Sequence, residues 1–272
     1  MRATAAFLSF AAVAPGHHRE YNAWHQLDHR PENLVLDGVL AGERWVRTPG
    51  CAALYPVDDP VLAQTHYVNS YWFKGPVAEA LAEWRELAER SFQQGRRPDV
   101  RIATRPMMGT FAPVSGYAAR HARVSPLALL RRPARGVVLS IHRLTEPRAA
   151  QSESWLGARE EQMRRRVEIP GVAGAWSLSS VSTTIDPGWQ PTPGSMTFDP
   201  SPAGSGYLRA ELTFLDGDPL AVVERLDGLE PGRGRPDPAV CEEAFVSLLL
   251  PITPWEWDWF GPGPDSGEKP DS

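Results

Sequence analysis

The stretch A-A-F-L-S-F-A-A-V, residues 5–13, decides how the rest of the chain is interpreted. It follows Met1-Arg2 and resembles the apolar part of a short signal peptide, but it also has the length of a buried β-strand. The second half carries a comparable run, G-V-V-L-S-I-H-R-L at 136–144, and similar segments follow both runs. Because cleavage would delete the counterpart of a strand that the second half retains, we predict that residues 5–13 are the first strand.

Both halves show the same order of strand and helix patterns. The first half predicts strands at 5–13, 37–46, 65–75 and 105–114, and helices at 18–36 and 76–92. The second half predicts strands at 136–144, 169–178, 207–217 and 244–252, and helices at 152–167 and 218–229. In the helix at 76–92, for example, Leu81, Trp84 and Leu87 recur at three-residue spacing behind Pro76 in the first turn. Residues 181–205, rich in Pro, Gly, Ser and Thr, are predicted to form a long loop.

This order, βαββαβ twice, is the ferredoxin-like pattern. Each unit would place its helices on one face of a four-stranded antiparallel sheet, and the uncovered face must be buried. We therefore predict an α+β fold in which two tandem ferredoxin-like units pack as an α+β barrel within one chain. The predicted divisions are a first unit at 1–115, a linker at 116–134, a second, degenerate unit at 135–260 and a disordered tail at 261–272.

Composition narrows the classes of function. The net charge of −5 leaves no basic field to hold phosphate backbones, so we do not expect nucleic-acid binding. No run of 18 apolar residues suggests a membrane-spanning helix. Cys51 and Cys241 form no C-x-x-C unit, which favours a reducing cytoplasm. The sequence also lacks a glycine-rich phosphate loop and a nucleophile elbow, which argues against nucleotide-dependent and hydrolytic chemistry.

The first predicted helix contains E-Y-N-A-W-H-Q-L-D-H-R-P-E, residues 20–32. On an α-helix one continuous stripe would hold Tyr21, Trp24, His25, Asp28, His29 and Glu32. An imidazole there can act as a general base or a donor near neutral pH, with Asp28 or Glu32 orienting it. Two alternatives stay open: His25 and His29 chelate a metal, although no third ligand can be named, or the stripe is structural.

The same stretch resembles the first helix and second strand of the EthD-like proteins, which belong to the dimeric α+β barrel superfamily. The matching residues are Trp24, Asp28-His29, Pro31, Asp37-Gly38-Val39 and Arg44-Trp45. In the second half Trp155 aligns with Trp24, but Glu160 stands where His29 stands and no proline follows. The resemblance therefore implies a chemical first unit and a mainly structural second one. The superfamily includes cofactor-independent monooxygenases, polyketide cyclases, lactone isomerases and haem enzymes, so the fold narrows the reaction little, and a single histidine could serve as a haem ligand.

Other segments contribute further candidates. On the strand at 65–75, alternation would place Tyr67, Asn69, Tyr71 and Phe73 on one face and His66, Ser70 and Trp72 on the other. We expect Tyr71 or Trp72 near the pocket. His142 could also point inward, and Trp255, Trp257 and Trp259 of the tail could cover a sheet edge or the mouth of the barrel.

These inferences lead to a cytoplasmic enzyme that binds a small hydrophobic molecule, aromatic or polyketide-like. Its reaction would be cofactor-independent: proton transfer, as in a cyclase or isomerase, or monooxygenation. The catalytic candidates are His29, Asp28 and His25, and the ligand-binding candidates are Tyr21, Trp24, Tyr71 and Trp72, with no metal. The alternative is a non-catalytic ligand-binding or protein-interaction module. Whether the chain also forms a homodimer stays open.

Overall fold

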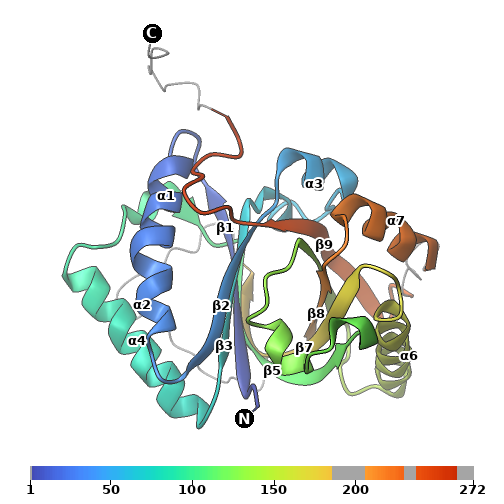
Figure 1. Ribbon diagram of the computed structural model, residues 1–272. Coiled ribbons are helices and arrows are strands. Elements are labelled where there is room, and N and C mark those ends of the chain that lie inside the picture. Colours follow the sequence, from blue (N-terminus) through green and yellow to red (C-terminus); the bar gives the residue numbers. More distant parts are fainter. Residues whose placement is uncertain (1, 186–205, 230–236, 262–272) are drawn as a thin grey trace.

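The computed structural model describes residues 2–185, 206–229 and 237–261, and Figure 1 shows its elements. The strands are β1 (Ala5–Val13), β2 (Val39–Val46), β3 (Tyr67–Phe73), β4 (Ala103–Thr104), β5 (Met107–Ala118), β6 (Gly136–Leu144), β7 (Val172–Ile185), β8 (Leu208–Leu215) and β9 (Cys241–Pro251). The α-helices are α1 (His18–Trp24), α2 (Arg30–Leu34), α3 (Pro49–Leu54), α4 (Val77–Gln93), α5 (Pro126–Leu129), α6 (Ala150–Arg166) and α7 (Pro219–Leu229). A π-helical segment, η1 (His25–His29), joins α1 to α2, and short 3-10 turns lie at Leu62–Gln64, Val100–Ile102 and Arg120–Ala122.

Eight of the strands form a closed antiparallel barrel. Around the barrel the order is β1-β3-β2-β9-β6-β8-β7-β5, and β5 pairs with β1 to close it. The two halves meet at a long seam between β5 and β7 and at a short seam between β2 and β9. The β2–β9 seam joins only Trp45 and Val46 to Pro251 and Leu250. Farther along β2, the carbonyls of Leu40 and Gly42 accept from the side chains of Arg131 and Arg30 instead of from a strand.

Apolar side chains from both halves fill the inside of the barrel. Phe10 on β1 meets Phe245 on β9 with ring centroids 4.9 Å apart, and Trp72 on β3 meets Trp176 on β7 at 5.2 Å. The predicted alternation of β3 is confirmed, because Val68 and Trp72 belong to this interior cluster while Tyr71 packs on the outside. The interior is thus one core that neither half could bury alone.

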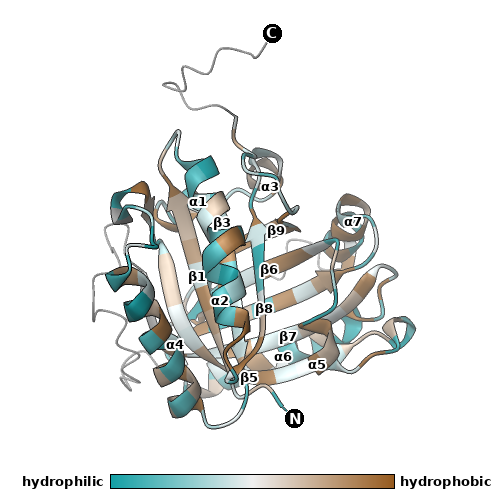
Figure 2. Cartoon of the chain, turned by 60° about the vertical axis from the view of Figure 1, so that its left-hand side comes forward, coloured by the Kyte–Doolittle hydropathy of each residue, from teal (hydrophilic) through white to brown (hydrophobic). Residues whose placement is uncertain are grey.

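The longer helices cover the outside of the barrel (Figures 1 and 2), whereas Leu129 of α5 belongs to the interior cluster. The chain from α1 to α2 and the long helix α4 lie over the first half, whereas α6 and α7 lie over the second. Helix α4 carries both hydrophilic and apolar residues, and its Trp84 packs against Phe7 with ring centroids 4.7 Å apart. Among the described residues, no helix has the length and apolar character that crossing a bilayer demands.

Most predicted elements are confirmed to within a few residues. The strands predicted at 5–13 and 136–144 have those bounds in the structure. The helix predicted at 18–36 is divided into α1, η1 and α2. β5 continues to Ala118, so it enters the predicted linker, which also holds α5. β7 continues to Ile185, so it enters the predicted long loop. Residues 186–205 of that loop and 262–272 of the predicted disordered tail lie outside the described residues.

The C-terminal segment after β9 runs back to α1. Asn22 Nδ2 donates to Trp257 O at 2.5 Å, and Gln26 Nε2 donates to Glu256 O at 2.8 Å. Trp259 packs on the cluster that contains Tyr21, whereas Trp255 is 71% exposed. The tail therefore runs along the first helix, where only Trp259 of its three tryptophans packs on the cluster. The sequence had suggested that the three cover a sheet edge or the barrel mouth.

Gly38, in the Asp37-Gly38-Val39 turn, permits the close approach of α4. A Cβ atom at Gly38 would lie 2.6 Å from Ala80 Cβ and 2.8 Å from Ala80 Cα. We expect Gly38→Ala to lower the free energy of unfolding by about 1–3 kcal/mol, because the helix backbone must shift. Gly157→Ala in α6 is the control: nothing lies within 4 Å of that Cβ, so alanine should raise stability by about 0.5–1 kcal/mol. Urea denaturation measures both, and equal signs would contradict the explanation.

Candidate functional site

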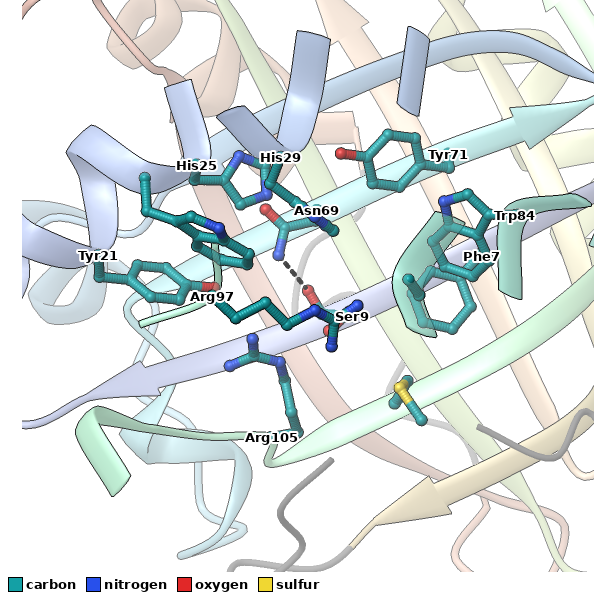
Figure 3. A pocket seen from close by; sticks show the side chains of 13 residues that line it. Phe7, Ser9, Tyr21, His25, His29, Asn69, Tyr71, Trp84, Arg97 and Arg105 are labelled. Carbon is teal, nitrogen blue, oxygen red and sulfur yellow. Dashed lines mark hydrogen bonds between the residues drawn. The ribbon is translucent and has the colours of Figure 1, made fainter. Parts of the chain in front are cut away.

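A cavity of about 60 Å³ lies between the outer face of the first-half sheet and the helices that cover it (Figure 3). Its lining residues come from β1, β3, β5, α1, η1, α4 and the connection after α4: Phe7, Ser9, Tyr21, Trp24, His25, His29, Asn69, Tyr71, Trp84, Ala88, Arg97, Arg105 and Met108. This volume is smaller than the several hundred Å³ of pockets that enclose a drug-sized ligand. It suits a small ligand or the polar end of a larger one.

The π-helical segment sets which side chains face this cavity. Arg30 N donates to His25 O, five residues back, so the segment contains one more residue than an α-turn would. As a result Trp24 and His29, five residues apart, stack with ring centroids 4.6 Å apart and an interplanar angle of 24°. The sequence predicted one uninterrupted helix with a six-residue stripe. The extra residue instead turns Asp28 away, and its carboxylate pairs with Arg96 at 3.4 Å.

The hydrogen bonds of Asn33 fix the tautomer of His29. Asn33 Nδ2 donates to His29 O at 2.6 Å, and since a carbonyl oxygen only accepts, this atom must be the amide NH₂ group. The same NH₂ group lies 3.3 Å from His29 Nδ1, so Nδ1 is an acceptor and the ring proton is on Nε2. Burial, followed by the nearby charges of Arg97 and Arg105, holds the pKa of His29 well below its usual range. The imidazole is therefore a neutral donor near pH 7.

His25 lies beside His29, with ring centroids 5.0 Å apart, and is 1% exposed. Neither of its ring nitrogens has a hydrogen-bond partner among the described residues. Burial lowers the pKa of His25 well below 6.5, and the charge of Arg44 lowers it further. A neutral imidazole with a free nitrogen in a cavity can accept a proton from a ligand.

Tyr71 and Asn69 form the floor of the cavity on β3. Gly42 on β2 lies opposite Tyr71, and a Cβ at Gly42 would come within 2.6 Å of the Tyr71 ring, so glycine makes room for this ring. Burial raises the pKa of Tyr71, which keeps its hydroxyl protonated. Asn69 Nδ2 donates to Ser9 O at 3.4 Å, and its Oδ1 has no partner within the described part of the chain.

Three arginines lie near the histidines and the polar side chains of the cavity. Arg97 and Arg105 line the cavity, and Figure 3 shows them on the opposite side of Asn69 from His25 and His29. Arg44, 1% exposed, lies between the rings of Tyr21 and Tyr67, with its Cζ 4.8 and 4.3 Å from their centroids. Its three guanidinium nitrogens have no hydrogen-bond partner among the described residues. No Asp or Glu appears among the lining residues, so the cavity is electropositive.

The structure brings together five of the seven residues that the sequence singled out. Tyr21, Trp24, His25, His29 and Tyr71 line the cavity. The other two lie elsewhere: Asp28 pairs with Arg96, and Trp72 points into the barrel interior. In the described ranges, no three His, Cys, Asp or Glu side chains gather as a metal site.

Sequence reasoning did not find Asn69, Arg97 and Arg105 as members of one site. The sequence placed Asn69 on the same face of its strand as Tyr71, but no feature of the sequence indicated that Asn69 belongs to a site. Arg97 follows α4 and Arg105 precedes β5, where no periodicity constrains a side chain. Arg44 was part of the EthD-like motif, and this was the only signal that could have drawn attention to it.

The outer face of the second half is built differently. Helix α6 has no π segment, so the residue one turn after Trp155 is Arg159, whose Cζ lies 5.8 Å from the Trp155 ring. Glu160, which the sequence alignment placed opposite His29, accepts instead from the Tyr117 hydroxyl. His142 is 2% exposed and packs edge-on against Trp155 at 5.2 Å, on this same half.

No protein-family model matches this sequence, and no curated protein matches it. Solved structures do match. An anthrone oxidase-like protein aligns over 93% of this chain and 92% of its own, with 11% identity and a TM-score of 0.55. A candidate monooxygenase from Fusobacterium nucleatum subsp. nucleatum aligns over 93% and 94%, with 5% identity and a TM-score of 0.55. At such identities the likeness concerns architecture, and together with the closed barrel it shows that the chain has an α+β barrel fold.

Proposed function

We propose that this protein is a small-molecule enzyme of the α+β barrel type that removes a proton from its substrate in the cavity beneath α1, η1 and α2. The observation that carries the proposal is the pair of neutral imidazoles 5.0 Å apart. His29 is fixed as an Nε2–H donor, and His25 has both ring nitrogens without a partner among the described residues. The two histidines therefore differ in role: His29 is a hydrogen-bond donor, and His25 can accept a proton.

In the proposed step, His25 accepts a proton from an acidic C–H or O–H bond of the substrate. The bonding electrons stay on the substrate as an enolate or phenolate. His29 Nε2–H donates a hydrogen bond to the developing oxyanion, and Arg97 and Arg105 stabilise its charge. Proton transfer of this kind suffices for a cyclase or isomerase. In a monooxygenase the same enolate would reduce dioxygen.

The walls of the cavity suit a planar, partly apolar substrate. Phe7, Trp24 and Trp84 supply flat aromatic surfaces, and Tyr21 and Tyr71 add hydroxyl groups. The names of the solved structures with the same architecture, one anthrone oxidase-like and one a candidate monooxygenase, are compatible with an oxidisable aromatic substrate. Since a cavity of about 60 Å³ admits only a few atoms, we propose that it holds the reactive end of the molecule.

We also infer that the chain consists of two ferredoxin-like units, the first of EthD-like character. The order β5-β1-β3-β2 in the first half matches the order β9-β6-β8-β7 in the second, with the fourth element of each half beside its first. The helix positions repeat as well. Under this interpretation the barrel that other chains form by pairing two copies is made here by one chain.

The test is the exchange of a substrate proton for deuterium. We expect the wild-type protein to accelerate exchange at the central carbon of a small 1,3-diketone, followed by NMR, and His25→Gln to slow the catalysed exchange by about 10²–10⁴-fold, the usual contribution of a general base. His17→Gln is the matched control, because His17 precedes the same helix but its side chain is 47% exposed and lies outside the cavity. Equal exchange in wild type and His25→Gln would sink the mechanism. Binding of the diketone without exchange would favour a binding module.

A further inference from the structure

Asn69 in the first half of the barrel and Glu211 in the second half occupy equivalent positions, as the serines that they pair with show. Ser9 is the fifth residue of the nine-residue strand β1, and Ser140 is the fifth residue of the nine-residue strand β6. Ser9 pairs with Asn69 on β3, and Ser140 pairs with Glu211 on β8. Asn69 and Glu211 therefore occupy the same site on the outer face of the two sheets.

In the second half this site holds a carboxylate between two arginines. Arg159 Nε donates to Glu211 Oε1 at 3.0 Å, and a second Arg159 nitrogen lies 2.5 Å from Oε2. Arg166 donates to Oε2 at 2.7 Å. Glu211 and Arg159 are only 3% and 7% exposed. The negative charge that neutralises these arginines is thus built into the chain.

In the first half, arginines from other segments surround the equivalent position, and no carboxylate stands there. Asn69 is neutral, while Arg97 and Arg105 line the cavity beside it and Arg44 lies buried behind Tyr21. The guanidinium of Arg44 and Nε of Arg97 have no hydrogen-bond partners among the described residues. Asp28 of η1 is engaged by Arg96, and Glu89 of α4 also acts on the charge of Arg97 without lining the cavity. A buried charge without a hydrogen-bond partner, such as Arg44, is costly, and the partly buried Arg97 and Arg105 add to the positive charge, so this arrangement favours an anion.

We propose that the substrate carries a carboxylate, which binds between Arg97, Arg105 and Asn69 and takes the place that the Glu211 side chain fills in the second half. This inference rests on the proposed function, in that it treats the cavity as the substrate site. Arginine suits the role because its planar guanidinium matches a carboxylate with two parallel hydrogen bonds. Asn69 is uncharged, and this leaves the arginines available, because a carboxylate at this position would compete with the ligand for them.

The decisive variant restores the residue of the second half. In Asn69→Glu the new carboxylate should pair with the arginines, raising Tm by about 2–5 °C and removing the response to added carboxylates. Asn69→Gln lengthens the side chain equally but stays neutral, so it should not raise Tm and should still respond. If Asn69→Glu instead lowers Tm and still binds carboxylates, the arginines do not form the anion site.

Ligand binding supplies an independent test on the unmodified protein. The probes are propionate with propionamide, and benzoate with benzamide, two pairs that differ in charge and little in shape. We expect the carboxylate of each pair to raise Tm by about 5 °C when its concentration is about 100 times its Kd. The matching amide should have no effect at equal ionic strength. Arg97→Gln should abolish the shift. Arg101→Gln, on the same connection but 86% exposed and paired with Asp99, should retain it.

The outcomes separate this inference from the proposed function. If amides stabilise the protein as well as carboxylates do, the substrate is not recognised as an anion, although proton exchange through His25 would still stand. If carboxylates bind through Arg97 but wild type and His25→Gln exchange the diketone proton equally, the anion site stands and the catalytic mechanism fails. Inorganic phosphate is the third probe: a larger shift with phosphate than with carboxylates would overturn the assignment of the ligand class.

Discussion

Glu211→Gln is expected to lower the free energy of unfolding by about 3–5 kcal/mol, the usual cost of removing one partner from a buried ion pair. The glutamine keeps the shape of the side chain, so the loss measures the charge together with the hydrogen bonds that one carboxylate oxygen accepts. Arg159 and Arg166, at 8% and 11% side-chain exposure, would then lose the buried carboxylate that bridges them. Urea denaturation at pH 7 measures the difference.

The control for Glu211 is the same substitution on the exposed side of α6. Glu161 pairs with Arg165 at 3.7 Å, and both side chains are more than half exposed. Glu161→Gln should change stability by less than about 1 kcal/mol, because solvent screens such a pair. Comparable losses in the two variants would mean that the Glu211 cluster contributes no more than a surface ion pair.

The pH dependence of stability separates this cluster from the histidines. Burial alone would raise the pKa of Glu211, but Arg159 and Arg166 hold it well below its usual value of 4.5. A carboxyl group with a depressed pKa stabilises the fold above its unfolded pKa, so this contribution should be lost as the pH falls below about 4.5. Glu211→Gln should lack that part of the loss.

The buried histidines act in a higher pH range. Burial lowers the pKa of His18 to about 4, and burial also lowers the pKa of His25 and of His29 below 6.5. The unfolded chain therefore binds these protons first, and stability should begin to fall as the pH drops below about 6.5. This earlier loss should persist in Glu211→Gln and should shrink in His25→Gln.

Phe10→Ala is the second change with a large expected effect, a loss of about 3–5 kcal/mol. Phe10 on β1 is fully buried and packs on Phe245 of β9, which belongs to the other half of the chain. Since the barrel interior is one core, the substitution should destabilise both halves together. Phe92→Ala is the control, because Phe92 on α4 is 39% exposed and should contribute little.

Hydrogen exchange distinguishes a shared core from two independent ones. If the halves share the core, the amides of β6 and β8 lose protection in Phe10→Ala as much as those of β1 and β3 do. Retained protection in β6 and β8, with loss confined to the first half, would show that the second half folds by itself and would contradict the single core.

The positions of the strands and helices could be predicted from the sequence because local pattern determines them. Residues 5–13 and 136–144 are apolar runs of strand length, and the helix at 76–92 places apolar residues on one side. The side-chain alternation of β3 also followed from its sequence, since successive residues of a strand point to opposite faces. Which face would meet a ligand did not follow, and Tyr71 and Trp72 lie on opposite sides of the sheet.

The membership of the candidate site was decided by tertiary structure. An α-helical pattern placed Asp28 in the same stripe as Trp24 and His25, but the π segment adds one residue to the turn, and Asp28 meets Arg96 instead. Such a segment is energetically tolerable only where packing compensates for it, here through the stacking of His29 on Trp24. The convergence of Arg44, Arg97 and Arg105 depends on contacts between segments far apart in the chain. The sequence by itself determined the positions of the strands and of the histidines, whereas the charge that surrounds those histidines exists only once the barrel has closed.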